Sequence, residues 1–258
     1  MTLTNEKPAS DETFDPTAEA KLLLRCSRAA ALATLEPEGF PFASLVNVAT
    51  APDGSPILLV SRLAGHTRHL DVDPRMSLLF CSALDQPSEG DPLAHSRLTI
   101  LGRAVRVKDD TEPSLRARFL ARHPESSVYA DFVDFGFFRV TVESAHLNGG
   151  FARAANLSAE TLLTSLKDAD DLVADEASVL KEIGDEKANL ARDLASAYGG
   201  ASDKSWRVIG FDPEGLDIGD DERIIRVPFA ERAATEEELW VQVAALLAET
   251  PGLNQAPS

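Results

Sequence analysis

The side chains best suited to hold an anion are gathered in one segment, SRLAGHTRHL, at Ser61–Leu70. The segment follows an apolar run, PILLV, and ends before an Asp-Pro pair. We expect a short helix here, capped by Thr67 or His66. Free backbone N–H groups at a helix start, a hydroxyl and a guanidinium together form a phosphate site. Arg62 ends the preceding strand and can converge on the same point. The alternative is an ordinary turn with solvated arginines.

Five histidines bear on metal or haem chemistry. His66 and His69 stand three residues apart and can share a helix face, as metal ligands do. No suitable set of Asp, Glu, His or Cys completes such a site, so no metal is expected. His95 and His123 lie in polar contexts and are expected to face solvent. A haem iron needs an imidazole, thiolate or phenolate donor. His66, His69 or His146 could serve, and the sequence selects none of them.

Charge and composition exclude several classes of partner. The chain has 258 residues, of which 25 are basic and 42 acidic, giving a net charge of −17. Such a charge repels polyphosphate, so nucleic acid is not expected as a partner. The N-terminus MTLTNEKPASDETFD is unlike a signal peptide, and no apolar run reaches the ~18–20 residues of a membrane span. We therefore expect a cytoplasmic location and no membrane partner. Cys26 and Cys81 are expected to be small buried hydrophobes.

The elements that must position these side chains are mostly short strands. A helix begins at Asp15-Pro16, since Asp is a good N-cap and proline suits the first helical position. Alternating or apolar runs then predict strands at AALATLE, FASLVNVATA, PILLVSRL, RMSLLFCSAL and SRLTILGRAVRVK, with a tight turn at Asp53-Gly54. A helix capped near Thr111 and a closing strand, GFFRVTVESAHL, follow. Strands so closely spaced favour an antiparallel barrel or sandwich.

The second part of the chain combines helices with strands. ANLSAETLL is expected to be an irregular or short helical connector. Residues 169–200 read as one long amphipathic helix or a broken pair, stopped by Gly199 and Gly200. The runs WRVIGFDPEGLDI and DERIIRVPF predict a hairpin. Thr235 and Glu238 form a capping box that opens the last helix.

The run VSRLAGHTRHLDVDPRMSLLF resembles the core of the haem-utilisation branch of the pyridoxamine 5′-phosphate oxidase-like split barrels. In that superfamily this segment holds the phosphate of FMN. The match implies that Thr67 and Arg68 are the phosphate ligands and that Arg62 helps them. RLTILG, which begins at Arg97, is similar to a strand at the family's dimer interface, and HLNGGFARA is similar to its closing motif. The cofactor-binding residues that the resemblance implies are Ser61, Arg62, His66, Thr67, Arg68 and Arg97.

The resemblance implies an α+β protein. Residues 1–14 are expected to form a disordered N-terminus and residues 15–155 an antiparallel split β-barrel of the FMN-binding type. Residues 156–258 are expected to form a small helix–hairpin–helix α+β domain. The barrel is expected to be a homodimer with its site at the subunit interface. The function implied is an FMN-dependent oxidoreductase acting on a small molecule that the sequence does not identify, and no catalytic residue is assigned.

Two other functions stay open. The first is haem binding or haem degradation on the same dimeric barrel, with the arginines clamping propionates. Haem-degrading relatives supply an axial histidine from near the C-terminus, whereas this chain has no histidine after His146. Its C-terminal part resembles a module fused to these barrels, but Ile183–Asn189 lacks that module's two histidines. The second is a non-enzymatic binding or interaction protein with a degenerate site.

Overall fold

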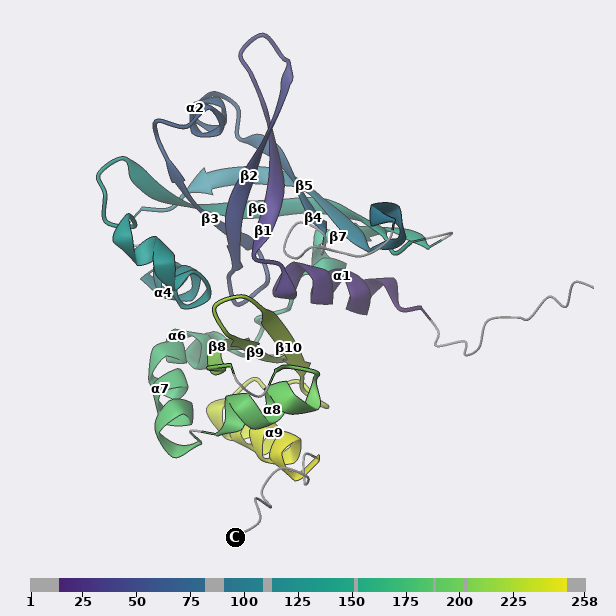
Figure 1. Ribbon diagram of the computed structural model, residues 1–258, viewed down its shortest axis with the longest axis vertical. Coiled ribbons are helices and arrows are strands. Elements are labelled where there is room, and N and C mark those ends of the chain that lie inside the picture. The colour runs from purple at the N-terminus through teal and green to yellow at the C-terminus, as the bar shows by residue number, and fades with distance from the viewer. Residues whose placement is uncertain are drawn as a thin grey trace, which may run out of the picture.

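The computed structural model describes residues 14–81, 91–108, 113–150, 153–187, 189–201 and 204–249. The disorder expected for the N-terminus, apart from Phe14, and the helix cap expected at Thr111 lie outside the described residues. Figure 1 shows a β-rich N-terminal part, a smaller C-terminal part with most of the helices, and helix α1 between them.

Six antiparallel strands close into a barrel, which confirms the predicted architecture. The sheet order is β3-β2-β1-β4-β5-β6-β7, and an additional pairing of β3 with β6 closes it. The long strand β6 makes closure possible, because its first residues pair with β3 and its last residues pair with β7. The strands are β1 (Ala29–Leu35), β2 (Pro41–Thr50), β3 (Pro56–Ser61), β4 (Arg75–Cys81), β5 (Arg97–Arg106), β6 (Phe135–Asn148) and β7 (Ala154–Ser158).

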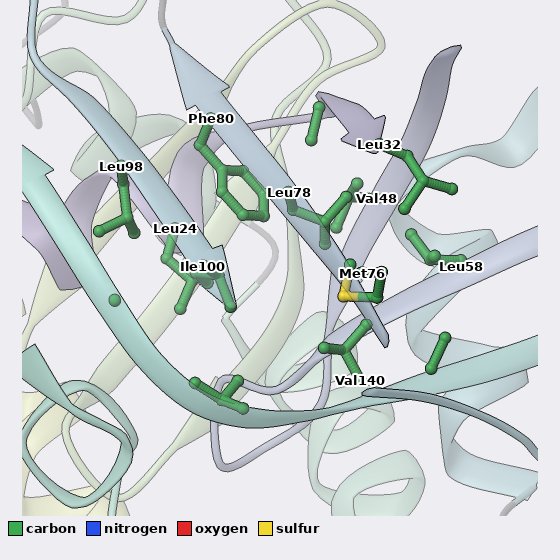
Figure 2. Packing of buried hydrophobic residues seen from close by; sticks show 14 of the residues in the cluster. Leu24, Leu32, Val48, Leu58, Met76, Leu78, Phe80, Leu98, Ile100 and Val140 are labelled. Carbon is green, nitrogen blue, oxygen red and sulfur yellow. The ribbon is translucent and has the colours of Figure 1, made fainter. Parts of the chain in front are cut away.

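Alternation along the strands fills the barrel with apolar side chains. Leu32, Leu78 and Ile100 point into one cluster and are fully buried (Figure 2). Each such side chain removed from water stabilises the fold by about 1.5–3 kcal/mol. The predicted turn at Asp53 and Gly54 joins β2 to β3, and Gly54 adopts a φ of 90° that other residues rarely tolerate.

Helices cover the ends of the barrel. Asp15 caps α1 (Pro16–Cys26), since its carboxylate accepts hydrogen bonds from the N–H groups of Thr17 and Ala18, as predicted. Helix α2 (Gly65–Val72) lies between β3 and β4, and α4 (Pro113–Arg122) packs beside β2 and β3. Short 3₁₀ helices occur at η1 (Pro92–Ala94) and η2 (Pro124–Val128).

The C-terminal part differs in detail from the sequence prediction. The connector ANLSAETLL contains strand β7, followed by α5 (Ala159–Leu162). Residues 156–158 complete β7, so this strand crosses the boundary expected between residues 155 and 156. Three helices replace the long helix, and three strands replace the hairpin. They are α6 (Asp170–Ala174), α7 (Glu176–Glu186), α8 (Leu190–Ala197), β8 (Arg207–Asp212), β9 (Gly215–Gly219) and β10 (Ile224–Pro228).

The last helix, α9 (Glu236–Glu249), begins at the predicted capping box. Thr235 Oγ1 accepts from the N–H of Glu238, and the Glu238 carboxylate accepts from the N–H of Thr235. Leu239 and Val243 of this helix pack into the C-terminal core with Leu216 of β9. No helix among the described residues is long and apolar enough to cross a bilayer.

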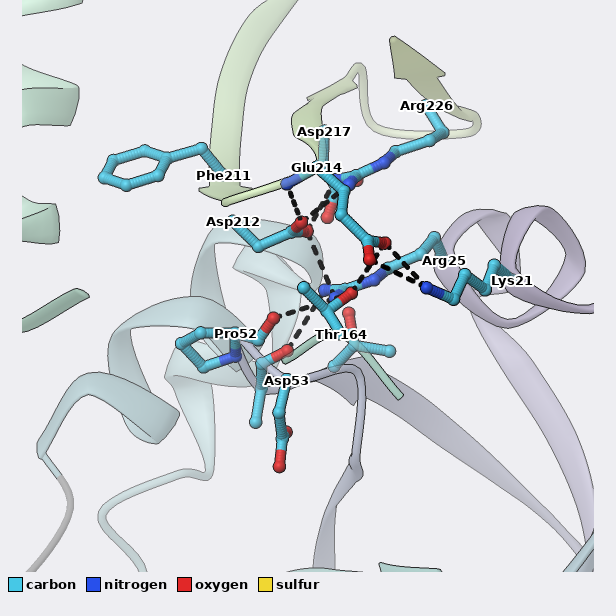
Figure 3. Close-up of polar contacts among 12 residues, drawn as sticks. Lys21, Arg25, Pro52, Asp53, Thr164, Phe211, Asp212, Glu214, Asp217 and Arg226 are labelled. Carbon is cyan, nitrogen blue, oxygen red and sulfur yellow. Dashed lines mark hydrogen bonds and ion pairs between the residues drawn. The ribbon is translucent and has the colours of Figure 1, made fainter. Parts of the chain in front are cut away.

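Buried charges join the two parts. On β9, Leu216 and Ile218 belong to the C-terminal apolar cluster, whereas Asp217 between them contacts Arg122 of α4 and Arg226 of β10. Figure 3 shows Asp217 and Arg226 among the charged side chains between α1 and the three-stranded sheet. Burial, with a contribution from Asp217, raises the pKa of the Cys26 thiol to about 11, so this cysteine stays protonated at neutral pH.

Candidate functional site

The first turn of α2 offers free backbone donors. Its N-cap residue is Ala64, which has no side chain able to accept a hydrogen bond. The predicted caps were wrong, because Thr67 and His66 lie inside the helix. The backbone N–H groups of Gly65, His66 and Thr67 therefore make no hydrogen bond to any described residue. Such a helix start attracts anions through these donors and the helix dipole.

Two exposed arginines flank this turn. Arg62 Nη2 donates to the Val133 carbonyl at 2.8 Å, and Arg68 Nη1 donates to the Leu63 carbonyl at 2.8 Å. Within the described residues neither arginine pairs with a carboxylate, whereas nearby Arg75 is held by Asp73 at 2.5 Å. The α2 turn, which we define as residues 61–68, thus has two positive charges and unused N–H donors.

The hydroxyls predicted to contact a ligand have other surroundings. Thr67 is fully buried, and its Oγ1 has no hydrogen-bond partner among the described residues. The backbone N–H of Thr67 makes no hydrogen bond to any described residue. Ser61 Oγ donates to Asp134 Oδ2 at 2.6 Å and accepts from the N–H of Leu63 at 3.1 Å. Ser61 therefore fixes the shape of the turn.

The loop before β6 supports the turn in a way that sequence reasoning missed. Besides the bond from Ser61, the Asp134 carbonyl accepts from the N–H of Arg62 at 2.7 Å. Asp134 is brought to the turn because the next residue, Phe135, pairs with Ser61 at the end of the β3–β6 ladder. This pairing joins residues far apart in the sequence, so local sequence patterns do not predict it.

Exposed apolar side chains adjoin the positive charges. Leu63 is 75% exposed, Phe132 is 55% exposed and Val133 is 88% exposed. Leu63 follows Arg62 in the chain, and the Arg62 guanidinium binds the Val133 carbonyl. Apolar surface beside two arginines suits an anion that has a large apolar body.

Arg97 lies apart from the other predicted site residues. It pairs with Cys81 and Asn148, at the end of β4 farthest from α2. Six residues of strand β4 separate that end from Arg75, a span of roughly 20 Å at ~3.3 Å per residue. Its Nη1 donates to the carbonyls of Leu93 at 2.8 Å and His95 at 3.2 Å. One chain alone does not bring Arg97 to the α2 turn.

The two histidines of α2 are tied to the β1–β2 hairpin. His66 Nδ1 lies 3.0 Å from Ser44 Oγ, and His69 Nδ1 lies 3.0 Å from Thr34 Oγ1. Burial, together with the neighbouring His69, lowers the pKa of His66. The lowered pKa favours the neutral form of the His66 imidazole at physiological pH.

His123 corrects an expectation. It is 1% exposed, its Nε2 lies 2.9 Å from the Val48 carbonyl, and its ring packs against Phe119. Its polar sequence neighbours do not predict its exposure, because α4 packs on β2 and places His123 against that strand. Because His123 is buried there, it is not available to a ligand at the α2 turn.

One face of the barrel sheet exposes several apolar side chains. The register places Ala31 of β1 between Leu45 of β2 and Leu79 of β4. Leu101 of β5 lies one row away, and Leu45, Leu79 and Leu101 are 65%, 37% and 49% exposed. We call this surface the outer sheet face.

Comparisons with known proteins agree on the family. A family model described as Pyridoxamine 5′-phosphate oxidase matches residues 16–149. Over 143 residues the chain is 36% identical to an Arabidopsis thaliana protein named non-canonical heme oxygenase HOZ, chloroplastic. That match covers 55% of this chain but only 42% of the Arabidopsis protein.

Two solved structures resemble nearly the whole chain. The protein Atu2129 of Agrobacterium tumefaciens, of unknown function, is 31% identical with a TM-score of 0.79, over 91% of this chain and 96% of its own. A heme binding protein from Mycobacterium smegmatis is 26% identical with a TM-score of 0.53, over 92% of this chain and 97% of its own.

Proposed function

This chain belongs to the pyridoxamine 5′-phosphate oxidase family of split barrels, and we propose from that premise that it binds haem at the α2 turn. The observation that carries the proposal is the α2 turn itself, where unused N–H donors and two arginines without carboxylate partners adjoin exposed apolar side chains. The names of the Arabidopsis and mycobacterial relatives support haem as the ligand.

The residues present fit the three parts of a haem molecule. Arg62, Arg68 and the helix N-terminus suit the two propionate carboxylates. Leu63 and Val133 suit the apolar macrocycle, and histidines stand close by for the iron. Bound haem supplies redox chemistry at its iron, while this chain binds and orients it. The missing histidine near the C-terminus does not decide against haem, because α2 itself carries two imidazoles.

FMN is the second candidate ligand, with an oxidoreductase function. A helix start with unused N–H groups and flanking arginines is suited to a phosphate, and the family binds FMN in general. The isoalloxazine ring is also a flat body that can lie on the apolar side chains beside Arg62. Both ligands would place an anionic group at the α2 turn. The apolar side chains and histidines would then contact a macrocycle and its iron in haem, or the isoalloxazine ring in FMN.

We also propose that the protein is a homodimer with the site at the subunit interface. The outer sheet face exposes three leucines, and soluble proteins cover such side chains by association. Its Leu45 is the neighbour of Ser44, which binds His66 from the opposite side of β2. A second copy on this face is therefore separated from His66 by the thickness of strand β2, and we propose that Arg97 joins the site through that second copy.

Absorption spectra of the purified protein test the proposal. We expect a Soret band to grow to one equivalent per chain on titration with hemin, the ferric form of haem, and excess FMN to compete weakly. A flavin spectrum in the protein as purified, without saturable hemin binding, would instead select FMN. Binding of neither ligand would favour the non-enzymatic interaction protein.

A further inference from the structure

We infer that His66 is the residue of this chain that ligates the haem iron, with Ser44 as the residue that orients its ring. The inference rests on the proposed haem function and deepens it. It starts from the census of imidazoles, because the chain has five histidines and each has a defined environment in the structure.

Three histidines are placed away from the α2 turn. His123 is buried, and its Nε2 is engaged by the Val48 carbonyl. His95 precedes β5, where its carbonyl accepts from the Arg97 guanidinium at the far end of the sheet. His146 is opposite Thr99 near that same end, and its Nδ1 lies 2.8 Å from Asn156 Oδ1. Within one chain none of the three shares a helical turn with the anion-binding donors. His146 lies at the end of the sheet from which Arg97 of a second copy is proposed to join the site, so its variant tests a ligand from that copy.

His69 is closer, and contacts with Phe42 and Thr34 hold its ring. Its ring meets the Phe42 ring edge-on with centroids 5.1 Å apart, and its Nδ1 contacts Thr34, which is 2% exposed. The Phe42 ring and the Cε1 atom of His69 lie 3.6 Å and 4.0 Å from the position that a Cβ would take on Gly65. His69 therefore also reaches the first turn of α2, and it is the alternative ligand that the His69→Ala variant tests.

His66 lies in the first turn itself, between Arg62 and Arg68 in the sequence. A haem whose carboxylates contact those arginines and the free N–H groups therefore presents its macrocycle beside this imidazole. Nδ1 of His66 is taken by the Ser44 hydroxyl, and Nε2 makes no hydrogen bond to any described residue. With Nδ1 as the donor to Ser44, the lone pair of Nε2 is available to iron.

The environment also favours the correct charge state. Iron binds the neutral imidazole, and protonation competes with it. The positive end of the helix dipole and partial burial both disfavour an imidazolium at this position. A hydrogen-bond partner on the second ring nitrogen fixes the orientation of metal-bound histidines, and the Ser44 hydroxyl is in the position of that partner here.

Hemin-loaded full-length protein tests the assignment without reference to turnover. Resonance Raman spectra of the ferrous form report the iron–histidine bond directly. We expect this band to vanish in His66→Ala and in His66→Gln, and imidazole added to His66→Ala to restore a nitrogen-ligated Soret spectrum. We expect Ser44→Ala to keep the band but to weaken hemin binding about tenfold, the lower limit for loss of an outer partner. Arg192→Ala, on the exposed surface of α8, is the control and should behave as wild type. Loss of the band in His146→Ala would assign the ligand to a second copy and overturn the assignment to His66.

The outcomes separate this inference from the proposed function. Saturable hemin binding with an unchanged iron–histidine band in both His66 variants would overturn the assignment while haem binding stands. Loss of the band in His69→Ala alone would move the ligand to that residue. If wild-type protein bound no hemin, the proposed function would fail and the assignment with it. His66→Gln retains a side chain that can hydrogen-bond Ser44. Its resonance Raman spectrum therefore tests the assignment even if His66→Ala does not fold.

Discussion

Arg25 of α1 and Asp212 of β8 form an ion pair between the two parts of the chain, with Arg25 Nη2 3.1 Å from Asp212 Oδ2. Both side chains are almost entirely removed from water, and Arg226 lies 2.7 Å from the same carboxylate oxygen (Figure 3). Burial alone would raise the pKa of Asp212, but the two guanidiniums outweigh it and hold the pKa below its usual range. The two parts of the chain are therefore joined by a buried charge cluster in which Arg25 of the N-terminal part pairs with a carboxylate of the C-terminal part.

Asp212→Asn is expected to destabilise the whole protein. The substitution leaves two guanidiniums buried without their shared counter-charge, and breaking a buried pair in this way costs about 3–5 kcal/mol. Urea unfolding followed by circular dichroism measures the free energy of unfolding. Asp221→Asn is the control, because the Asp221–Arg207 pair is exposed and such pairs contribute about 0–1 kcal/mol. Equal losses in the two variants would contradict the account.

His123 is expected to make the protein sensitive to mild acid. Burial, with Arg122 and Arg28 close by, lowers the pKa of His123 to about 4. The unfolded chain binds this proton near pH 6.5, so the native state is fully favoured above that pH and loses stability as the pH falls toward 4. The expected loss between pH 7 and pH 5 is about 2 kcal/mol.

His123→Gln isolates this contribution, because an amide can donate to the Val48 carbonyl but does not titrate in this range. Free energies of unfolding at several pH values should fall less steeply in the variant than in the wild type. Parallel curves would show that His123 is not the group responsible.

The barrel could be read from local patterns, because alternation of polarity identifies a strand without knowledge of its partner. The turn at Asp53-Gly54 and the capping box of Thr235 and Glu238 could be predicted in the same way, since each involves residues that are close in the sequence. The α2 turn was found in the same way, from residue types that lie close together in the chain.

The features that the sequence did not predict depend on contacts between residues far apart in the chain. The burial of His123 depends on how α4 seats over β2, and the support from Asp134 depends on the β3–β6 ladder. The side chain of Thr67 turned inward because the barrel interior lies beneath that face of α2. Arg97 shows the same limit, since the strand register alone sets its distance from the other site residues.

Leu45→Asp is expected to convert a dimer to a monomer. A carboxylate on the outer sheet face cannot be buried against a second copy without a large desolvation cost. Light scattering coupled to size-exclusion chromatography measures the mass. Val241→Asp on α9 is the matched control, since Val241 is 60% exposed and lies outside the barrel. A wild-type protein that is monomeric at all concentrations would refute the dimer.

The central claim is that the α2 turn binds the carboxylates of haem, and hemin affinity of an arginine-free turn tests it most directly. The Arg62→Ala/Arg68→Ala protein should keep wild-type stability, because both side chains are exposed. Since a hydrogen bond to a charged group contributes about 1.5–3 kcal/mol, we predict at least a tenfold loss of hemin affinity. Arg192→Ala, on the exposed surface of α8, should bind as wild type. Unchanged hemin affinity in the double variant would contradict the account.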